Sequence, residues 1–305
     1  MSMPIFTKVT MKRSEMYDKF LEIVANGGWE VFDVGSQGHV IHSMGTRGNT
    51  KMEFKVSPFI GGSPAYDIRT GEYASANFIY IKDFDKISKT WSNYGTGSSA
   101  GYNFTLPFYK GSYPNTTSYQ QQVDRRTVVD VYFYVTKDVI IWYSVYPSYI
   151  TTTSNAMFMI GIPQELFLEE RTTGNYSGMV FVTNAGSQAN VVTSLVSYNT
   201  PKNYLESDNI QSEITKVDSP LKELDADNQI NMTDVIYGAS AYGYRGRLGY
   251  FYITPASNMI DGDIIELNTP TGVEKYVRIS LYFATNSYSQ SFLPSANMAV
   301  ALRIE

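Results

Sequence analysis

The stretch VVDVYFYVTKDVIIWYSVY, residues 128–146, decides the fold of this chain. Residues 128–135 and 139–146 are two runs rich in Val, Ile, Tyr, Phe and Trp, and Thr136-Lys137-Asp138 separates them as a short polar break. Two such runs joined by a turn predict an antiparallel β-hairpin. The density of large apolar residues in both runs predicts that the hairpin is buried on both faces, or has one face covered at an interface.

Away from this hairpin the residues mostly alternate with a period of two, which is typical of strands. In the first two thirds of the chain we expect strands at Trp29–Val34, Val40–Met44, Met52–Val56, Asn77–Lys82, Met157–Ile162, Met179–Thr183 and Val191–Tyr198. In the last third we expect them at Ile230–Tyr237, Leu248–Thr254, Asp263–Leu267, Tyr276–Ala284 and Met298–Ile304.

One helix is expected near the start of the chain. Its apolar residues recur at i, i+4, i+5 and i+8, namely Met16, Phe20, Leu21 and Val24. Ser14 is the expected N-cap and Glu15 places a negative charge in the first turn. Gly27-Gly28 supplies the positive φ that ends helices.

The predicted fold class is therefore mainly β, with antiparallel sandwich-like or barrel-like sheets and one N-terminal helix. We expect residues 1–200 to form a helix-plus-β domain, with a long loop at 94–114 that is rich in Gly, Ser, Asn and Tyr. Residues 201–227 are polar and acidic and are the expected linker, and residues 228–305 are the expected C-terminal β module.

The amino-acid composition favours a protein that acts through surface contacts over one that catalyses a reaction. The chain has no cysteine and two histidines but 25 tyrosines, and only 17% of its residues are charged. Tyrosine buries apolar area while its hydroxyl still finds a partner at a wet boundary. This composition indicates an assembly or binding protein rather than an enzyme.

Charge and hydropathy argue against two classes of partner. The net charge is −5, and no basic run is longer than Lys12-Arg13 or Arg125-Arg126, so nucleic acid is not expected as the main partner. No run of about 18 apolar residues occurs, and residues 1–13 have no secretory signal pattern, so no membrane partner is expected.

No metal or cofactor is expected. His39 and His42 lie three apart, so on a strand they point to opposite faces and cannot share one ion. The residues from Asp225 to Gln229 start like a calcium loop, but Ile230 stands where the loop needs glycine. No glycine loop has the spacing of a phosphate-binding motif.

No catalytic residue is expected either. Glu169 and Glu170 are adjacent carboxylates and therefore cannot face each other across a sugar. Neither histidine accompanies a Gly-x-Ser-x-Gly elbow.

Two aromatic segments are the candidate interface. Tyrosine and arginine are the residue types enriched at interface hot spots. For the segment at 237–252, the alternative is a twisted β-hairpin with exposed aromatics. The residues expected to make contacts are Tyr102, Phe104, Phe108, Tyr109, Tyr113, Tyr242, Tyr244, Arg245 and Arg247.

Two parts of the chain resemble structural proteins of tailed-bacteriophage virions. The first is YDKFLEIVANGGWEV, residues 17–31, in which a short helix closes with Gly-Trp before a strand. The second begins with GYRGRLGYFY at residues 243–252 and continues through GDII at 262–265, YVRI at 276–279 and the closing AVALRI at 299–304.

The resemblance implies a non-enzymatic building block of the virion, assembled in the host cytoplasm. It would form a homo-oligomeric ring or collar at the neck, tail or baseplate and contact other virion structural proteins. Two alternatives stay open: a receptor-binding or carbohydrate-binding tail module, and a cell-wall hydrolase.

Overall fold

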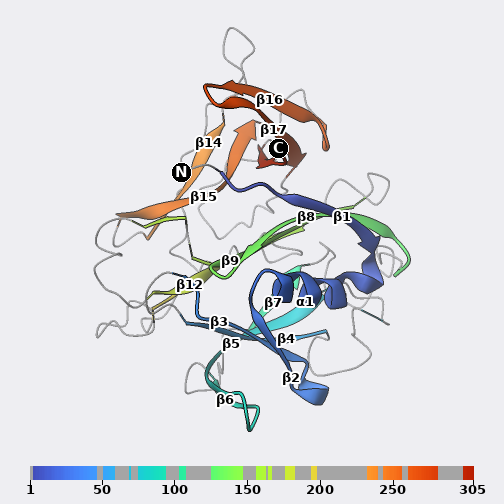
Figure 1. Ribbon diagram of the computed structural model, residues 1–305, viewed down its shortest axis with the longest axis vertical. Coiled ribbons are helices and arrows are strands. Elements are labelled where there is room, and N and C mark those ends of the chain that lie inside the picture. The colour runs from blue at the N-terminus through green and yellow to red at the C-terminus, as the bar shows by residue number, and fades with distance from the viewer. Residues whose placement is uncertain are drawn as a thin grey trace, which may run out of the picture.

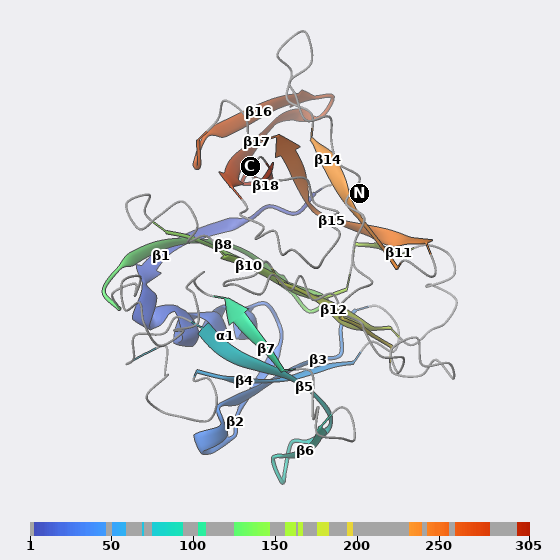
Figure 2. The same ribbon diagram turned by 180° about the vertical axis from the view of Figure 1, so that it is seen from behind.

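The described part of the computed structural model is built mostly of strands, which form three antiparallel sheets stacked in layers (Figures 1 and 2). The described residues are 3–46, 51–58, 69, 75–93, 103–107, 125–146, 156–162, 164–166, 176–182, 194–197, 232–239, 243–255, 260–280 and 298–305. The predicted mainly-β class with antiparallel sheets and one N-terminal helix is confirmed. Among the described strands, the sheets remain open and none closes into a barrel.

The middle layer, called here the central sheet, has the strand order β1-β8-β9-β10-β12-β13. The predicted hairpin is β8–β9, with Tyr132 opposite Tyr143 and Thr136 opposite Val139. Its strands are β1 (Thr7–Lys12), β8 (Val128–Thr136), β9 (Val139–Val145), β10 (Ala156–Gly161), β12 (Tyr176–Val182) and β13 (Ser194–Ser197).

A second layer, the helix-side sheet, has the order β2-β3-β4-β5-β6, with β7 also paired to β5. Helix α1 (Met16–Asn26) lies between this sheet and the central sheet (Figure 1). The strands are β2 (Glu30–Asp33), β3 (His39–Ser43), β4 (Met52–Ser57), β5 (Ser75–Asp85), β6 (Thr90–Asn93) and β7 (Asn103–Pro107).

The third layer, the C-terminal sheet, lies on the other side of the central sheet (Figure 2). Its order is β11-β15-β18-β17-β16, and β14 pairs with β15. The strands are β11 (Glu165–Leu166), β14 (Thr233–Ala239), β15 (Gly243–Pro255), β16 (Ile264–Thr269), β17 (Gly272–Ser280) and β18 (Met298–Arg303).

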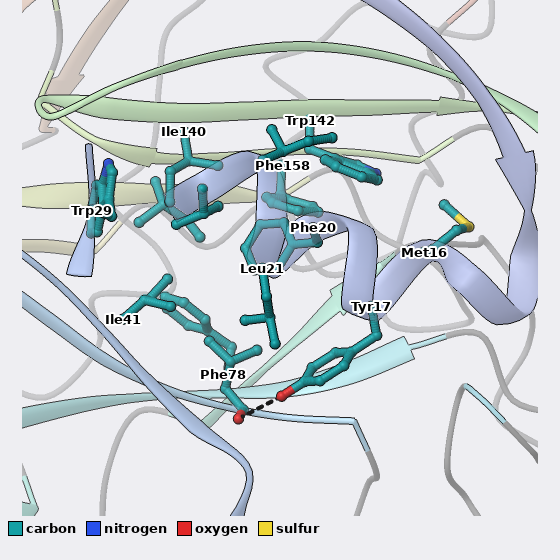
Figure 3. Close-up of a cluster of buried hydrophobic side chains, with 14 of the residues drawn as sticks. Met16, Tyr17, Phe20, Leu21, Trp29, Ile41, Phe78, Ile140, Trp142 and Phe158 are labelled. Atoms are coloured by element: carbon teal, nitrogen blue, oxygen red, sulfur yellow. Dashed lines mark hydrogen bonds between the residues drawn. The ribbon is translucent and has the colours of Figure 1, made fainter. Parts of the chain in front are cut away.

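The first core fills the space between the central sheet, α1 and the helix-side sheet. Trp142 and Phe158 of the central sheet lie nearly parallel, with ring centroids 6.2 Å apart, and Phe20 of α1 meets the Trp142 ring edge-on at 5.7 Å. Ile41 and Phe78 close the core from the helix-side sheet (Figure 3). Parallel and edge-on aromatic packing of this kind adds to the free energy gained by burial.

The second core lies between the central sheet and the C-terminal sheet. Ile141 and Tyr143 of β9 point into it, whereas Ile140 and Trp142 point into the first core. All four side chains have no exposed surface. The predicted burial on both faces is therefore confirmed for β9, and both covers belong to the same chain, whereas most side chains of β8 are only half-buried.

The two ends of the chain meet at this second core. The Phe6 amide donates to the Arg303 carbonyl at 2.6 Å, and the Arg303 guanidinium donates to the Met3 carbonyl at 3.3 Å. The Phe6 side chain is buried between the two sheets. Residues 3–6 thus lie on the C-terminal sheet, while the residues that follow them form the edge strand β1 of the central sheet.

The predicted division into domains stays a prediction. The expected linker, 201–227, lies outside the described residues. Strand β11 precedes the expected linker in the chain and pairs with β15, which follows the linker. The second core also contains residues from both sides of the linker.

The start of the helix differs from the sequence prediction. A 3-10 turn at Arg13–Glu15 precedes α1, and Glu15, not Ser14, occupies the N-cap position. The Ser14 amide instead donates to the Arg125 carbonyl at 3.1 Å, because this turn packs against the start of β8. The end is as expected, since Gly28 has a φ of 96° just beyond the last turn.

Two more corrections concern strands. The segment expected to be a loop at 94–114 contains β7, whose Phe104 lies opposite Phe78 of β5. Strand β1 was not predicted, although Val9 and Met11 alternate with polar residues. Both strands are short, and their pairing partners lie far away in the sequence, so local periodicity carries little signal for either.

Candidate functional site

Most of the predicted contact residues have no described side chain. Tyr102, Phe108, Tyr109, Tyr113 and Tyr242 lie outside the described residues. For Phe104 in β7, and for Tyr244 and Arg245 in β15, the structure describes the backbone only. Arg247 is the remaining predicted contact residue, and its side chain is described.

Arg247 ties three strands of the C-terminal sheet together. Its Nη1 lies 2.8 Å from Asp234 Oδ2 on β14, and its Nε lies 3.3 Å from Glu165 Oε2 on β11. The side chain stays exposed. An exposed ion pair contributes at most about 1 kcal/mol, so this guanidinium is available for contacts at little cost in stability.

A tyrosine pair borders this cluster. The rings of Tyr252 and Tyr276 lie 5.9 Å apart, and Asp234 stands opposite Tyr252 in the strand pairing. The Tyr276 hydroxyl donates to Glu274 at 2.6 Å, and Arg303 pairs with the same carboxylate at 3.2 Å. Burial and the hydrogen bond to Glu274 raise the pKa of Tyr276, so this hydroxyl is neutral and acts as a donor.

We call this set the Tyr–Arg surface, and it is the best-described candidate site for contacts. It consists of Glu165, Asp234, Arg247, Tyr252, Glu274, Tyr276 and Arg303. Charges of both signs and the half-buried ring of Tyr252 stand here on hydrogen-bonded strands, whereas the neighbouring Tyr276 ring is buried.

Another tyrosine of the same segment has a different role. Tyr250 is buried in the second core and its hydroxyl donates to the Ile162 carbonyl at 2.5 Å. Leu248, two residues earlier in β15, is buried in the same core, and Gly249 between them has a φ of 69° and lies against the Gln164 side chain. The segment is therefore part core and part surface, so tyrosine content alone does not mark the contact residues.

The two histidines point to opposite faces of β3, as strand alternation predicts. His39 Nδ1 lies 2.9 Å from the hydroxyl of Tyr17 on α1, a hydroxyl that also donates to the Val56 carbonyl at 3.1 Å. In Figure 3 the Tyr17 ring extends from the helix toward the strands below it. Burial lowers the pKa of His39.

His42, on the other face, belongs to a charged row that the sequence analysis missed. Its Nδ1 lies 2.7 Å from Glu30 Oε2, and its Nε2 lies 4.0 Å from Glu53 Oε1. Lys86, in the turn between β5 and β6, reaches the same Glu30 oxygen at 2.5 Å, and Lys51 Nζ lies 3.0 Å from Glu53 Oε1. These five groups come from four separate segments, and only the pairing of β2, β3 and β4 aligns them.

This charged row fastens the β5–β6 hairpin onto the sheet. Besides the bond from Lys86, the Lys89 ammonium donates to the Asp33 carbonyl at 2.7 Å, and the Phe84 ring packs 5.1 Å from Phe32. In the described part of the chain, no group of three side chains that could hold a metal ion is found. The arrangement supports a structural role for the row.

No family model matches this chain, and no curated protein matches it as a relative. In the described part of the chain, no helix has the length and apolar character needed to cross a membrane.

Proposed function

We propose that this protein is a non-enzymatic structural component of a tailed-bacteriophage virion. In this proposal the chain forms a homo-oligomeric ring or collar at the neck, tail or baseplate and contacts other virion structural proteins. It assembles in the host cytoplasm and acts through shape and surface contact.

The Tyr–Arg surface is the observation that carries the proposal. Arg247, Tyr252 and the ion pairs around them stand on strands of a hydrogen-bonded sheet. A contact surface that is ordered before binding loses little conformational entropy when a partner docks. Arginine and tyrosine are also the residue types that dominate interface energetics.

The two motifs that resemble virion proteins support the same proposal. Residues 17–31 supply helix α1 and the start of β2, and residues 243–252 lie within β15, the longest strand of the C-terminal sheet. Both motifs therefore form secondary-structure elements of the layered fold.

The direct test is the mass of the particle that the chain forms. Sedimentation velocity of the purified protein, together with mass spectrometry of purified virions, should give a closed oligomer and the chain's peptides in the particle. A strictly monomeric chain that is absent from every particle would contradict the proposal.

A second candidate is a carbohydrate-binding tail module. Tyr252 is half-buried and lies beside the Asp234 carboxylate, and an aromatic ring with adjacent carboxylates can stack on a sugar and accept hydrogen bonds from its hydroxyls. A glycan array would favour this candidate if it gives signals that Tyr252→Ala removes while the protein stays folded.

A further inference from the structure

The turn between β5 and β6 carries the most exposed large apolar side chain of the described residues. This residue is Ile87, which is 95% exposed. Turns are usually occupied by Gly, Pro, Asn, Asp and Ser, so an isoleucine here is not explained by turn chemistry. The β5–β6 hairpin lies at one end of the long axis of the molecule (Figures 1 and 2). We call residues 85–90 the hairpin tip.

The hairpin tip is ordered by hydrogen bonds within the turn and to β2. The Ile87 and Ser88 amides both donate to Asp85 Oδ1, at 2.8 and 3.2 Å, and the Lys89 amide donates to the Asp85 carbonyl at 2.8 Å. The Lys89 ammonium donates to the Asp33 carbonyl at 2.7 Å. Ile87 is therefore presented on a backbone that is ordered before any partner docks, which lowers the entropic cost of binding.

A second group of exposed aliphatic side chains lies near the opposite end of the long axis, at β16 (Figures 1 and 2). Ile260, in the turn before β16, is 74% exposed, and Ile264, the first residue of β16, is 48% exposed. Glu266 is also exposed and lies two residues along the strand, on the same face as Ile264. We call Ile260, Ile264 and Glu266 the end patch.

The end patch is ordered as well, and it lies at a sheet edge. The Ile260 amide donates to Asp263 Oδ2 at 2.7 Å, which fixes the turn before β16. In the described part of the C-terminal sheet, β16 is the last strand of the order. An exposed aliphatic side chain on an edge strand is a site at which another chain can dock.

The hairpin tip and the end patch have complementary charges. Lys89 and Glu266 are both exposed, and neither forms an ion pair among the described residues. Glu266 lies opposite Lys275, but Lys275 forms its ion pair with Glu305 at 2.7 Å. Each surface thus places a charge two residues after an exposed isoleucine, a cation on the hairpin tip and a carboxylate on the end patch.

We infer that the hairpin tip of one copy docks on the end patch of a second copy. Ile87 packs against Ile260 and Ile264, and Lys89 pairs with Glu266. The inference rests on the proposed function, because it assigns a contact within the homo-oligomer. A contact between two different surfaces of the same chain is heterologous, and it closes a ring when the rotation between successive copies closes.

Ile87 is the anchor of this contact and not the whole of it. A stable interface buries about 800 Å² on each partner, more than one side chain supplies. Strand β16 pairs with β17, which carries Glu274 and Tyr276 of the Tyr–Arg surface. A copy docked at the end patch therefore lies beside strands that contribute further contact residues.

A protein partner fits the hairpin tip better than a lipid surface does. A single isoleucine buries much less apolar area than a myristoyl chain, which itself gives only marginal membrane binding. Of the two lysines of the tip, Lys86 is already paired with Glu30. One unpaired cation provides little attraction to anionic lipid.

Truncating the two isoleucines in the full-length protein tests the contact. Sedimentation velocity over a series of protein concentrations should show that Ile87→Ser and Ile264→Ser each weaken self-association at least about tenfold. Far-ultraviolet circular dichroism should show that both variants stay folded, because the replaced side chains are exposed. The matched control is Val128→Ser on β8, whose side chain is 52% exposed and belongs to neither surface, and it should leave association unchanged.

A charge exchange tests the pairing of the two surfaces. Lys89→Glu and Glu266→Lys should each weaken association at low salt, because like charges then meet across the contact. The chain that carries both changes should associate with about wild-type affinity, since the charges match again. Recovery in this double variant also shows that loss in the single variants does not come from misfolding.

The other outcomes overturn the inference in distinguishable ways. Wild-type association that Ile87→Ser does not affect would overturn it and leave the proposed function standing. Association that responds to Ile87→Ser but not to Ile264→Ser would overturn docking at the end patch. Binding to phosphatidylserine vesicles that Ile87→Ser abolishes, with association unchanged, would assign the tip to a membrane. A wild-type protein that is monomeric at every concentration would overturn the proposed function as well.

Discussion

The indole nitrogen of Trp29 donates a hydrogen bond to the backbone carbonyl of Thr136 at a distance of 2.7 Å. This bond joins the residue that follows helix α1 to the turn of the central hairpin. The two glycines before Trp29 pack on the same turn, since a Cβ at Gly27 would lie 2.1 Å from Val135 Cγ1 and one at Gly28 would lie 3.0 Å from the Lys137 side chain. The Gly-Gly-Trp motif therefore docks the helix onto the hairpin.

Replacing Trp29 with phenylalanine should lower the free energy of unfolding by about 1–3 kcal/mol. The variant keeps an aromatic ring in the core but leaves the Thr136 carbonyl without its donor. Urea unfolding followed by far-ultraviolet circular dichroism measures the change. Trp91→Phe is the control, because Trp91 is only partly buried, and it should cost less; equal costs would contradict the role given to the indole bond.

Replacing Gly38 with alanine should be far more destabilising than the same change at Gly35. Both glycines have positive φ, 101° and 70°, so both changes carry a backbone cost of about 1–2 kcal/mol. A Cβ at Gly38 would also lie 2.3 Å from the Val56 carbonyl oxygen, whereas one at Gly35 meets nothing within 4 Å.

We expect a loss of more than about 3 kcal/mol for Gly38→Ala and about 1 kcal/mol for Gly35→Ala. Thermal unfolding of the two variants side by side checks this. Similar melting temperatures would show that β3 and β4 do not approach each other as closely as the structure has them.

Glu30 should contribute to the acid sensitivity of the fold. Its hydrogen bond to Lys86, and then the bond to His42, lower the pKa of its carboxyl. A carboxyl with a lowered pKa stabilises the folded state above its unfolded pKa of about 4.3, and this contribution is lost as the pH falls through the folded value.

Between pH about 5 and about 3, wild type should therefore lose more stability than Glu30→Gln. The difference should stay below about 1 kcal/mol, because the Glu30 side chain is 51% exposed. Urea unfolding across this pH range measures it, and added salt should reduce it. Parallel pH profiles for the two proteins would contradict the assignment.

Local patterns in the sequence predict the elements well, and the reasons are physical. The period of Met16, Phe20 and Val24 marks the helix, and the dense runs of 128–146 mark the central hairpin with its doubly covered strand β9. The alternation between His39 and His42 correctly separates their faces. Each of these signals depends on side-chain direction within one element, which the backbone geometry fixes.

What the sequence does not predict depends on strand register. Glu30, His42 and Glu53 form one row only because β2, β3 and β4 pair with a particular alignment. The hydrogen bond from Ser14 to Arg125 likewise depends on the pairing of β1 with β8. Tyr250 is buried because the C-terminal sheet packs on the central sheet, which tyrosine content cannot reveal.

Arg247→Met should weaken self-association while leaving the free energy of unfolding nearly unchanged. Its two ion pairs are exposed, so the free energy of unfolding should fall by no more than about 1 kcal/mol. If the Tyr–Arg surface is a contact surface as proposed, self-association should weaken at least about tenfold in sedimentation measurements.

Arg303→Met, at another member of the Tyr–Arg surface, gives the comparison for stability. The Arg303 guanidinium is mostly buried, pairs with Glu274 and donates to the Met3 carbonyl. Its loss should lower the free energy of unfolding by more than the loss of Arg247, since it leaves the largely buried Glu274 carboxylate without its cationic partner. Association that is unaffected by Arg247→Met would remove this residue from the contact surface.

In the layered fold, two consecutive residues of β9 are both buried, each in a different core. Ile140 and Ile141 are both fully buried, the first in the core shared with helix α1 and the second in the core shared with the C-terminal sheet. In a sheet covered on one face, one of two neighbouring residues points to solvent and tolerates truncation. Here Ile140→Ala and Ile141→Ala should each cost about 2–5 kcal/mol.

Val128→Ala on β8 is the reference for both changes, because its side chain is 52% exposed, and it should cost no more than about 0.5 kcal/mol. Urea unfolding of the three variants measures the difference. If Ile141→Ala lowers the free energy of unfolding as little as Val128→Ala does, the C-terminal sheet does not cover this face of β9 in solution. Truncating a covered side chain leaves a cavity, whereas truncating an uncovered one does not.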